Sequence, residues 1–175
     1  FSLDLCKMVE QQMWWCDEKK EHPLKQILKE YKYNQLFKKL ERLDITIDEI
    51  KESSFEDLKN RLGSEQNTKA IIEAAECFPS VELYAEYQPI TDDLYSISIN
   101  ISFPFKWNKS VVRDNELFWL FIQDTEGNEI YHSQEIYVDQ RIVKTGLQVK
   151  SLVPSSSNDS YIVSITSVRF LGVED

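Results

Sequence analysis

The sequence predicts an α+β protein whose helices and strands occupy separate halves of the chain. Up to Cys77, hydrophobic residues recur every three to four positions, which is the period of an amphipathic helix. From Val81 onward they alternate every two positions, which is the period of a strand with one buried face. The segment Phe78-Pro79-Ser80-Val81 separates the two patterns. We therefore expect a helical part followed by a β part.

The first helix is expected over residues 3–15. Its apolar side chains recur at helical spacing and cover more than one face: Leu5, Cys6, Met8, Val9, Met13, Trp14, Trp15 and Cys16. A helix of this kind is either buried on most sides or docks onto a neighbour that the chain does not contain.

Further short helices follow, and several of their ends carry recognisable signals. Pro23 starts one of them, since a missing N–H is harmless in the first helical turn, and residues 36–43 form the next. Thr46-Ile-Asp-Glu49 has the spacing of a capping box, and Ser54 begins a looser version. Gly63 is expected to end that helix, and residues 68–75 form the last one.

The two helices around Gly63 have the layout of a helix-hairpin-helix, in which the turn and the second helix offer backbone amides to a phosphate. The candidate nucleic-acid contacts are Lys59, Asn60, Arg61, Gly63, Ser64, Asn67 and Lys69. The alternative is a plain helical hairpin with a solvated face, because the usual turn carries two glycines and this one has a single glycine with Glu65 close by.

Seven strands are expected in the second half, and the first two, at residues 81–88 and 95–103, each have one buried face. The others are expected at residues 117–123, 129–133, 135–139, 147–153 and 161–168. Short strands at regular intervals predict a β-sandwich of immunoglobulin type. Its Cys-Trp-Cys core is missing here, which favours the fibronectin type III variety.

The charge and composition of the sequence limit the classes of function that the protein can have. The chain has 20 Lys and Arg against 30 Asp and Glu, a net charge of -10, and residues 81–175 hold 7 basic and 14 acidic residues. Non-specific affinity for nucleic acid comes mainly from Lys and Arg, so any contact should be local and in the helical half. No apolar run approaches the roughly 18 residues of a membrane span. The three cysteines show no CxxC spacing, which fits a reducing compartment.

Catalytic motifs are missing from the sequence. It contains no glycine-rich phosphate loop, HExxH, GxSxG or calcium-binding loop, so we expect no enzyme, metal or cofactor. His22 and His132 have no catalytic partner nearby in sequence and are expected to be structural. Phe105 and Trp107 are the candidate contacts for a protein partner, since aromatic residues concentrate at interface hot spots. Trp119 is expected in the core.

A series of ordered motifs resembles one family over nearly the whole chain. They are Leu5-Cys-Lys-Met8 with Met13-Trp14, Pro23-Leu24-Lys-Gln26, Phe78-Pro-Ser-Val-Glu-Leu83, Gln88-Pro-Ile-Thr91, Phe105-Lys-Trp107, Phe118-Trp119 with Asp124, Tyr131-His-Ser133, Val153-Pro154 and Ser167-Val-Arg-Phe-Leu-Gly172. The family is the Sec sixty-three homology unit that follows the ATPase core in large superfamily 2 RNA helicases, including those of the spliceosome. The chain departs from it at Val168 and Phe170, where the family has Asp and Trp.

The resemblance implies three parts in order. Residues 1–22 would be the last helix of a truncated helical bundle, residues 23–77 a helix-hairpin-helix domain, and residues 78–175 an immunoglobulin-like sandwich. The family also carries a final strand beyond the Leu-Gly motif, so the sandwich is expected to be one strand short.

The implied function is that of a non-catalytic accessory unit of an RNA helicase in pre-mRNA splicing. It would contact RNA weakly near the exit of the helicase core. Its partners would be that core in the same parent chain and proteins of the spliceosome or another complex, and it would not bind a membrane. The expected location is the nucleus, or alternatively the cytoplasm. Two alternatives stay open: the cytosolic part of an endoplasmic-reticulum translocation protein that only binds proteins, and an unrelated immunoglobulin-like adaptor.

Overall fold

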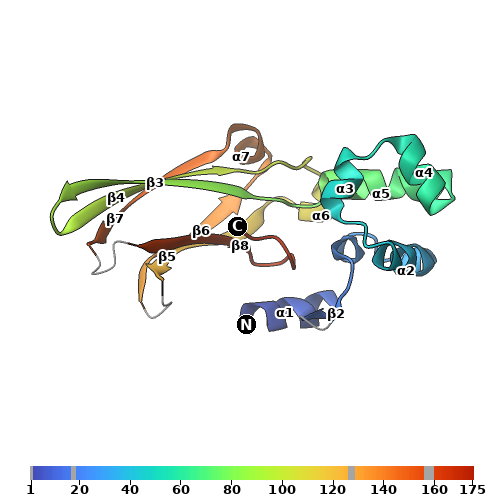
Figure 1. The fold of residues 1–175 in the computed structure, drawn as a ribbon, viewed down its shortest axis with the longest axis horizontal. Coiled ribbons are helices and arrows are strands. Elements are labelled where there is room, and N and C mark those ends of the chain that lie inside the picture. Colours follow the sequence, from blue (N-terminus) through green and yellow to red (C-terminus); the bar gives the residue numbers. More distant parts are fainter. Residues whose placement is uncertain (1, 17–18, 126–128, 156–159) are drawn as a thin grey trace. The chain divides into compact units, whose positions relative to one another are not determined.

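The computed structural model describes residues 2–16, 19–125, 129–155 and 160–175, and it confirms the α+β class (Figure 1). The chain divides into two compact units. The first, here called the helical unit, contains Phe1–Phe78 and Phe170–Gly172. The second, the sheet unit, contains Pro79–Arg169 and Val173–Asp175. The sequence also predicts a turn at residues 124–128 and a loop at residues 154–159, and both lie partly outside the described residues.

The helical unit is built from short helices around one apolar core. Its elements are α1 (Ser2–Gln11), the 3-10 turns Pro23–Gln26 and Tyr31–Tyr33, α2 (Asn34–Arg42), α3 (Ile47–Glu52), α4 (Phe55–Leu62), α5 (Glu65–Cys77), and a two-stranded ladder of β1 (Trp15–Cys16) and β2 (Lys19–Lys20). The fully buried side chains of this core include Leu24, Phe37, Leu40, Ile50, Leu58, Ile71 and Ala75. All lie on the inner faces of their elements, because burial of these faces drives the packing.

The first helix is shorter than the apolar pattern predicts. It ends at Gln11, because Gln12 adopts a left-handed backbone with φ of 55° and the chain turns away. Met13 then enters the core at 6% exposure. On the helix itself, Leu5 and Val9 stay exposed, at 49% and 73%. The prediction of one helix over residues 3–15 is therefore wrong at its C-terminal end.

The predicted helix caps in the rest of this unit are confirmed. The Thr46 hydroxyl accepts a hydrogen bond from the Glu49 amide, and the Glu49 carboxylate accepts one from the Thr46 amide, both at 3.2 Å. Ser54 caps α4 in the same manner through the Asp57 amide. The last helix begins at Glu65 rather than at residue 68, because Ser64 also acts as an N-cap.

The sheet unit contains two antiparallel sheets of three strands each, which lie as facing layers in Figure 1. The first has the order β3 (Glu82–Thr91), β4 (Leu94–Ser102) and β7 (Leu147–Pro154). The second has the order β6 (Ile130–Val138), β5 (Glu116–Asp124) and β8 (Tyr161–Ser167). The short helices α6 (Lys109–Val112) and α7 (Gln140–Thr145) were not predicted. The core between the sheets holds Ile97, Ile99, Ile101, Phe103, Phe118, Leu120, Ile122 and Ile165.

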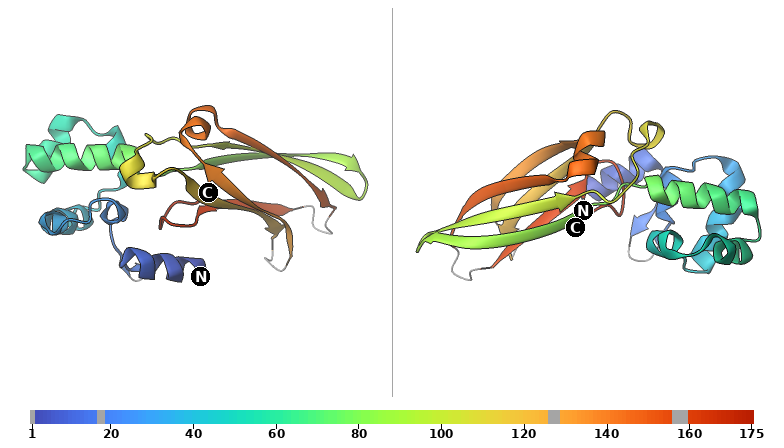
Figure 2. Two further views of the ribbon diagram at one scale, coloured as in Figure 1. Left: turned by 180° about the vertical axis from the view of Figure 1, so that it is seen from behind. Right: turned by 90° about the horizontal axis from the view of Figure 1, so that it is seen from above.

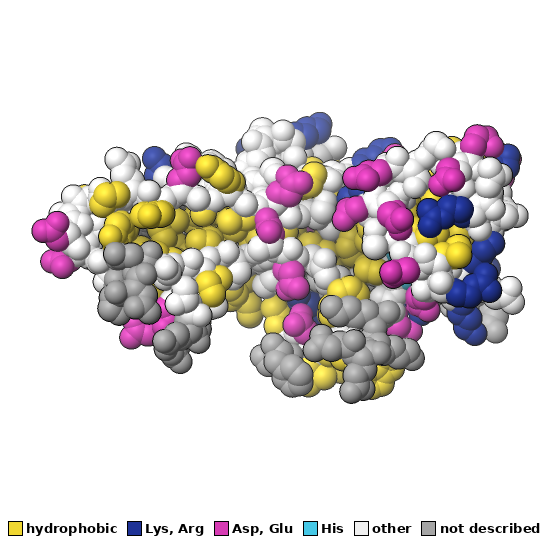
Figure 3. All heavy atoms as spheres, in the orientation of Figure 1, with side chains coloured by type: hydrophobic (Ala, Val, Ile, Leu, Met, Phe, Trp, Pro, Cys, Tyr) yellow, Lys and Arg dark blue, Asp and Glu magenta, His cyan; other side chains and the backbone are white. Residues whose placement is uncertain are grey.

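Two strand predictions are wrong. The segments 129–133 and 135–139 form one continuous strand, β6, whose central Gln134 pairs with Leu120. Strand β3 was predicted to bury one face, yet Ala85 and Tyr87 are exposed although they pair with buried residues of β4. The reason is that β3 is an edge strand whose inner side is left uncovered. Figure 3 shows the resulting band of hydrophobic side chains along the sheets.

Candidate nucleic-acid and partner sites

The predicted hairpin is formed by α4, Gly63 and α5, and Figure 2 shows the two helices from two further directions. Gly63 ends α4 in a left-handed conformation with φ of 76°, and its amide donates to the Lys59 carbonyl at 2.7 Å. A residue with a side chain is strained in this conformation, which explains the glycine. The Lys39 ammonium donates to the Leu62 carbonyl at 3.0 Å and so caps the C-terminus of α4.

The charges of this hairpin are largely paired. Glu65, in the first turn of α5, accepts a hydrogen bond from the Lys69 ammonium at 2.7 Å and lies 3.9 Å from that of Lys59. The hydrogen bond from Lys69 and the charges of both lysines lower the pKa of Glu65. Arg61 has a separate partner, Asp57, at 3.9 Å. The positive field that a phosphate would meet is reduced by these two carboxylates.

The structure brings only some of the predicted nucleic-acid contacts together. Lys59 and Lys69 meet at Glu65, whereas Arg61 turns to Asp57. The other predicted residues have these positions: Asn60 is exposed on α4, the Ser64 hydroxyl accepts from the Asn67 amide at 3.4 Å, and Gly63 forms the turn. The pairing of Lys69 with Glu65 could have been found from their spacing of four residues on a helix. The Lys39 cap carried no such signal, since it comes from a distant helix.

The two predicted partner contacts differ in exposure. Phe105 is buried, at 8% exposure, and its ring centroid lies 6.3 Å from that of Trp107. Trp107 is partly exposed and lines a cavity of 490 Å³. The other residues that line this cavity are Lys109, Asp114, Asp139, Gln140, Arg141, Lys144 and Thr145. Phe105 thus supports Trp107 from the core, and Trp107 faces the surface.

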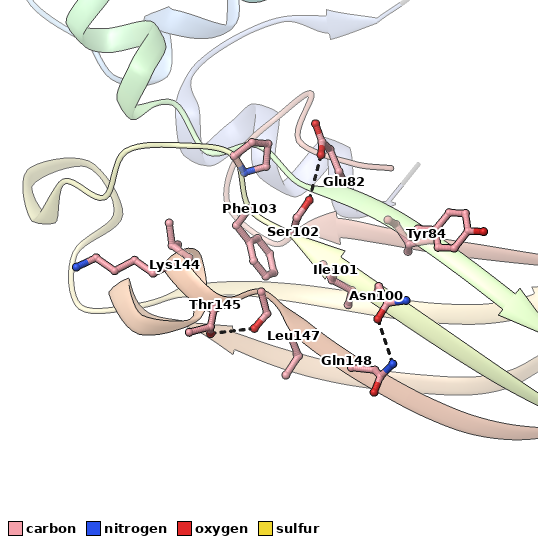
Figure 4. A pocket seen from close by; sticks show the side chains of 14 residues that line it. Glu82, Tyr84, Asn100, Ile101, Ser102, Phe103, Lys144, Thr145, Leu147 and Gln148 are labelled. Atoms are coloured by element: carbon pink, nitrogen blue, oxygen red, sulfur yellow. Dashed lines mark hydrogen bonds between the residues drawn. The ribbon is translucent and has the colours of Figure 1, made fainter.

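A second cavity, of 810 Å³, lies on the outer face of the sheet formed by β3, β4 and β7 (Figure 4). Its walls include the exposed Tyr84 and a polar pair in which the Gln148 amide donates to the Asn100 side chain at 3.1 Å. Lys144 and Thr145 of α7 line this cavity as well as the first one. The two hollows therefore meet at α7.

Two polar contacts hold the motifs near the end of the chain. The Gln26 side chain donates to the Leu171 carbonyl at 3.0 Å and accepts from the Leu171 amide at 2.8 Å, and both residues are buried. In the sheet unit, Arg169 pairs with the buried Glu116 at 2.6 Å, and Ser167 donates to the same carboxylate at 2.8 Å. Motifs that are far apart in sequence thus meet inside each unit.

Comparison with known proteins assigns the family. The model of the Sec63 Brl domain matches residues 1–175. The chain belongs to this family. Its relatives include the activating signal cointegrator 1 complex subunit 3 of Dictyostelium discoideum, 28% identical over 176 residues, and the U5 small nuclear ribonucleoprotein 200 kDa helicase of Caenorhabditis elegans, 29% identical over 174 residues. Each match covers 98% of this chain and 8% of the relative.

The human U5 small nuclear ribonucleoprotein 200 kDa helicase is also related, with 24% identity over 177 residues, 99% of this chain and 8% of that protein. The Sec63 Brl chain thus spans about 8% of the length of these relatives. Among the residues that the structure describes, no group of three or more His, Cys, Asp or Glu side chains could hold a metal ion. No helix in the described ranges is long and apolar enough to cross a membrane.

Proposed function

We propose that the chain is a non-catalytic accessory unit of an RNA helicase that acts in pre-mRNA splicing. The observation that carries this proposal is the family match over residues 1–175, together with relatives named as U5 small nuclear ribonucleoprotein helicases. Since the chain corresponds to about 8% of these relatives, the ATPase core would lie elsewhere in the parent protein. The proposed partners are that core and other splicing proteins, and the proposed location is the nucleus. Named helicases among the relatives favour this function over that of a translocation protein.

The hairpin of α4 and α5 is the proposed RNA contact. The left-handed turn at Gly63 precedes the N-terminus of α5, where helix amides without intrahelical acceptors favour an anion. Lys59, Arg61 and Lys69 would add charge beside this turn. Because Glu65 and Asp57 partly neutralise them, the contact would be weak and confined to the phosphates, with no preference for sequence.

A salt titration tests the RNA contact. Binding of fluorescent single-stranded RNA is measured by anisotropy at several salt concentrations for the wild type, for K59E/K69E and for K106E/K150E, which changes the net charge equally but lies in the sheet unit. The hairpin variant should bind more weakly, and its salt slope should fall by about 0.7 for each phosphate that the protein no longer neutralises. Glu65→Gln should bind RNA more tightly than the wild type, because it releases both lysines. Equal binding curves for the two double variants would contradict RNA binding at the hairpin.

The exposed face of α1 is the proposed contact with the rest of the parent protein. Leu5 and Val9 lie one turn apart and are 49% and 73% exposed, and the Cys6 side chain beside them is also exposed. Such a row of apolar side chains on a helix is usually covered by a neighbouring element. We assign residues 1–22 to the end of a helical bundle on this basis. If Leu5→Ser left the stability of the parent helicase unchanged, this assignment would be wrong.

The finer fold is part of the same proposal. Residues 23–77 would form a helix-hairpin-helix domain, and the facing sheets of residues 78–175 an immunoglobulin-like sandwich. The exposed Ala85 and Tyr87 leave room for one more strand, and the hydrogen bonds by which Ile165 and Ser167 of β8 pair with Asp175 and Val173 favour its place beside β8. In an experimental structure of the parent protein, a strand continuing from Asp175 along β8 is expected, and a different element at this place would contradict it.

A further inference from the structure

Three of the seven basic residues in residues 81–175 line one cavity of the sheet unit. Residues 81–175 contain 7 basic and 14 acidic residues. Four of these seven lie in the two short segments 106–109 and 141–144, and three of the four, Lys109, Arg141 and Lys144, line the cavity beside Trp107. This half of the chain, which is acidic overall, thus places three of its seven cations around a single cavity.

The two carboxylates of this cavity are already engaged. Asp114 pairs with Lys109 at 3.2 Å. The Asp139 carboxylate caps α7 by accepting from the Arg141 and Ile142 amides, both at 2.9 Å, and these hydrogen bonds, that of Ile142 first, lower the pKa of Asp139. The carboxylate of Asp139 also attracts the Arg141 side chain across the cap.

The charged groups of α7 remain available at the surface. Arg141 and Lys144 are three positions apart, so they lie on the same side of the helix, and both are exposed. Within the described part of the chain, no carboxylate oxygen lies within 4.0 Å of either charged group. In Figure 4 the Lys144 side chain extends away from the sheet. These two cations can therefore meet charges from outside without breaking an ion pair.

The cavity also has an apolar wall. The Trp107 ring lines it and is backed by Phe105 in the core. The indole Nε1 of Trp107 is buried without an acceptor among the described residues, so no hydrogen bond fixes the ring. The volume of 490 Å³ lies within the range of roughly 300–1,000 Å³ that is usual for ligand pockets. One apolar side chain of a partner could pack against this ring.

We infer that this cavity and the adjoining side of α7, here called the α7 groove, bind an extended acidic segment of a partner protein. Its carboxylates would face Arg141 and Lys144, and an apolar residue would pack on Trp107. This inference rests on the proposed function, in which the chain binds other splicing proteins. A peptide fits better than RNA, because a peptide can place its charges away from Asp114 and Asp139, whereas regularly spaced phosphates would also meet the seven excess acidic residues of this half.

An unbiased selection tests this chemistry. A displayed library of random peptides of about 12 residues, a length suited to extended recognition, is selected on the purified chain. Enriched peptides are synthesised, and their binding is measured by anisotropy to the wild type, to R141E/K144E and to K51E/K150E. The last variant has the same change in net charge but alters exposed lysines outside the groove. Circular dichroism checks that each variant folds.

The enriched peptides should contain an excess of Asp and Glu with one large apolar residue. Their affinity should fall about tenfold or more in R141E/K144E and about twofold or less in K51E/K150E. Trp107→Ala should weaken binding about fivefold or more, and Trp107→Phe, which keeps the ring, should weaken it less.

The inference would be overturned by no enrichment, by enriched peptides without acidic excess, or by equal binding to both double variants. In the last case the chain would still bind peptides, so the proposed binding of partner proteins would survive while the α7 groove would not. Competition by single-stranded RNA with an affinity equal to that of the peptides would also overturn it, because it would make the groove a general anion site. The RNA titration at the hairpin uses other residues and succeeds or fails independently.

Discussion

The buried amide of Gln26 offers the sharpest test of how this chain is held together. Its side chain forms two hydrogen bonds with the backbone of Leu171, 145 positions away, in the same way as two strands pair. Gln26 is 5% exposed and Leu171 is fully buried. Removal of the side chain therefore leaves a buried N–H and a buried carbonyl without partners. Each such group costs about 1–3 kcal/mol, so Gln26→Ala should lower the free energy of unfolding of the helical unit by about 2–6 kcal/mol.

The variant Gln26→Glu tests the two hydrogen bonds to Leu171 separately. At neutral pH the carboxylate can accept from the Leu171 amide but cannot donate to the carbonyl, so this variant should also be destabilised. Protonation would restore a donor, and burial beside a carbonyl raises the pKa of the new carboxyl group. A group whose pKa is higher in the folded state contributes stability that is full below its unfolded value, about 4.3, and is lost as the pH rises. The stability of Gln26→Glu should therefore recover relative to the wild type on acidification.

Urea unfolding followed by circular dichroism at 222 nm measures these changes, and hydrogen exchange of the Leu171 amide reports the bond directly. Gln66→Ala is the matched control, because Gln66 is exposed on α5 and its loss should change stability by less than about 0.5 kcal/mol. If Gln26→Ala were as stable as this control, or if the Leu171 amide kept its protection, the reciprocal hydrogen bonds would have no energetic role.

Two further predictions concern buried polar groups. Burial lowers the pKa of His22 from 6.5, so the stability that depends on its neutral ring is full above about pH 6.5 and is lost as the pH falls. Urea unfolding measured from pH 7 to 5 should show that His22→Asn removes this part of the pH dependence of stability. A pH profile equal to that of the wild type would refute the prediction. Arg169→Met should lower the free energy of unfolding by about 3–5 kcal/mol, because it removes the cation that neutralises the buried Glu116 carboxylate. Lys109→Met, which removes the exposed pair with Asp114, should lower it by at most about 1 kcal/mol. Thermal unfolding of Arg169→Met and Lys109→Met checks these values. The double variant E116Q/R169M should recover part of the stability that Arg169→Met loses.

Features that depend on neighbours in sequence could be predicted from the chain alone. The α+β class, the caps at Thr46 and Ser54, and the end of α4 at Gly63 each follow from a few adjacent side chains and backbone geometry. The alternation of β4 likewise located a strand with a buried face. Lys59 and Lys69 could also be proposed as candidate contacts, since their charge and helical positions are visible in the sequence.

Only the tertiary structure decided which of these groups are available and which surfaces are covered. Helical period alone cannot show that α1 stops at Gln11, because the turn at Gln12 serves the burial of Met13. Alternation predicted a buried face for β3, but burial requires an opposing layer that covers it, and Ala85 and Tyr87 stay exposed. The joining of Gln26 to Leu171 and the gathering of cations at α7 bring distant segments together. Local patterns record backbone preference, whereas burial, pairing and site formation are set by contacts between residues far apart in the chain.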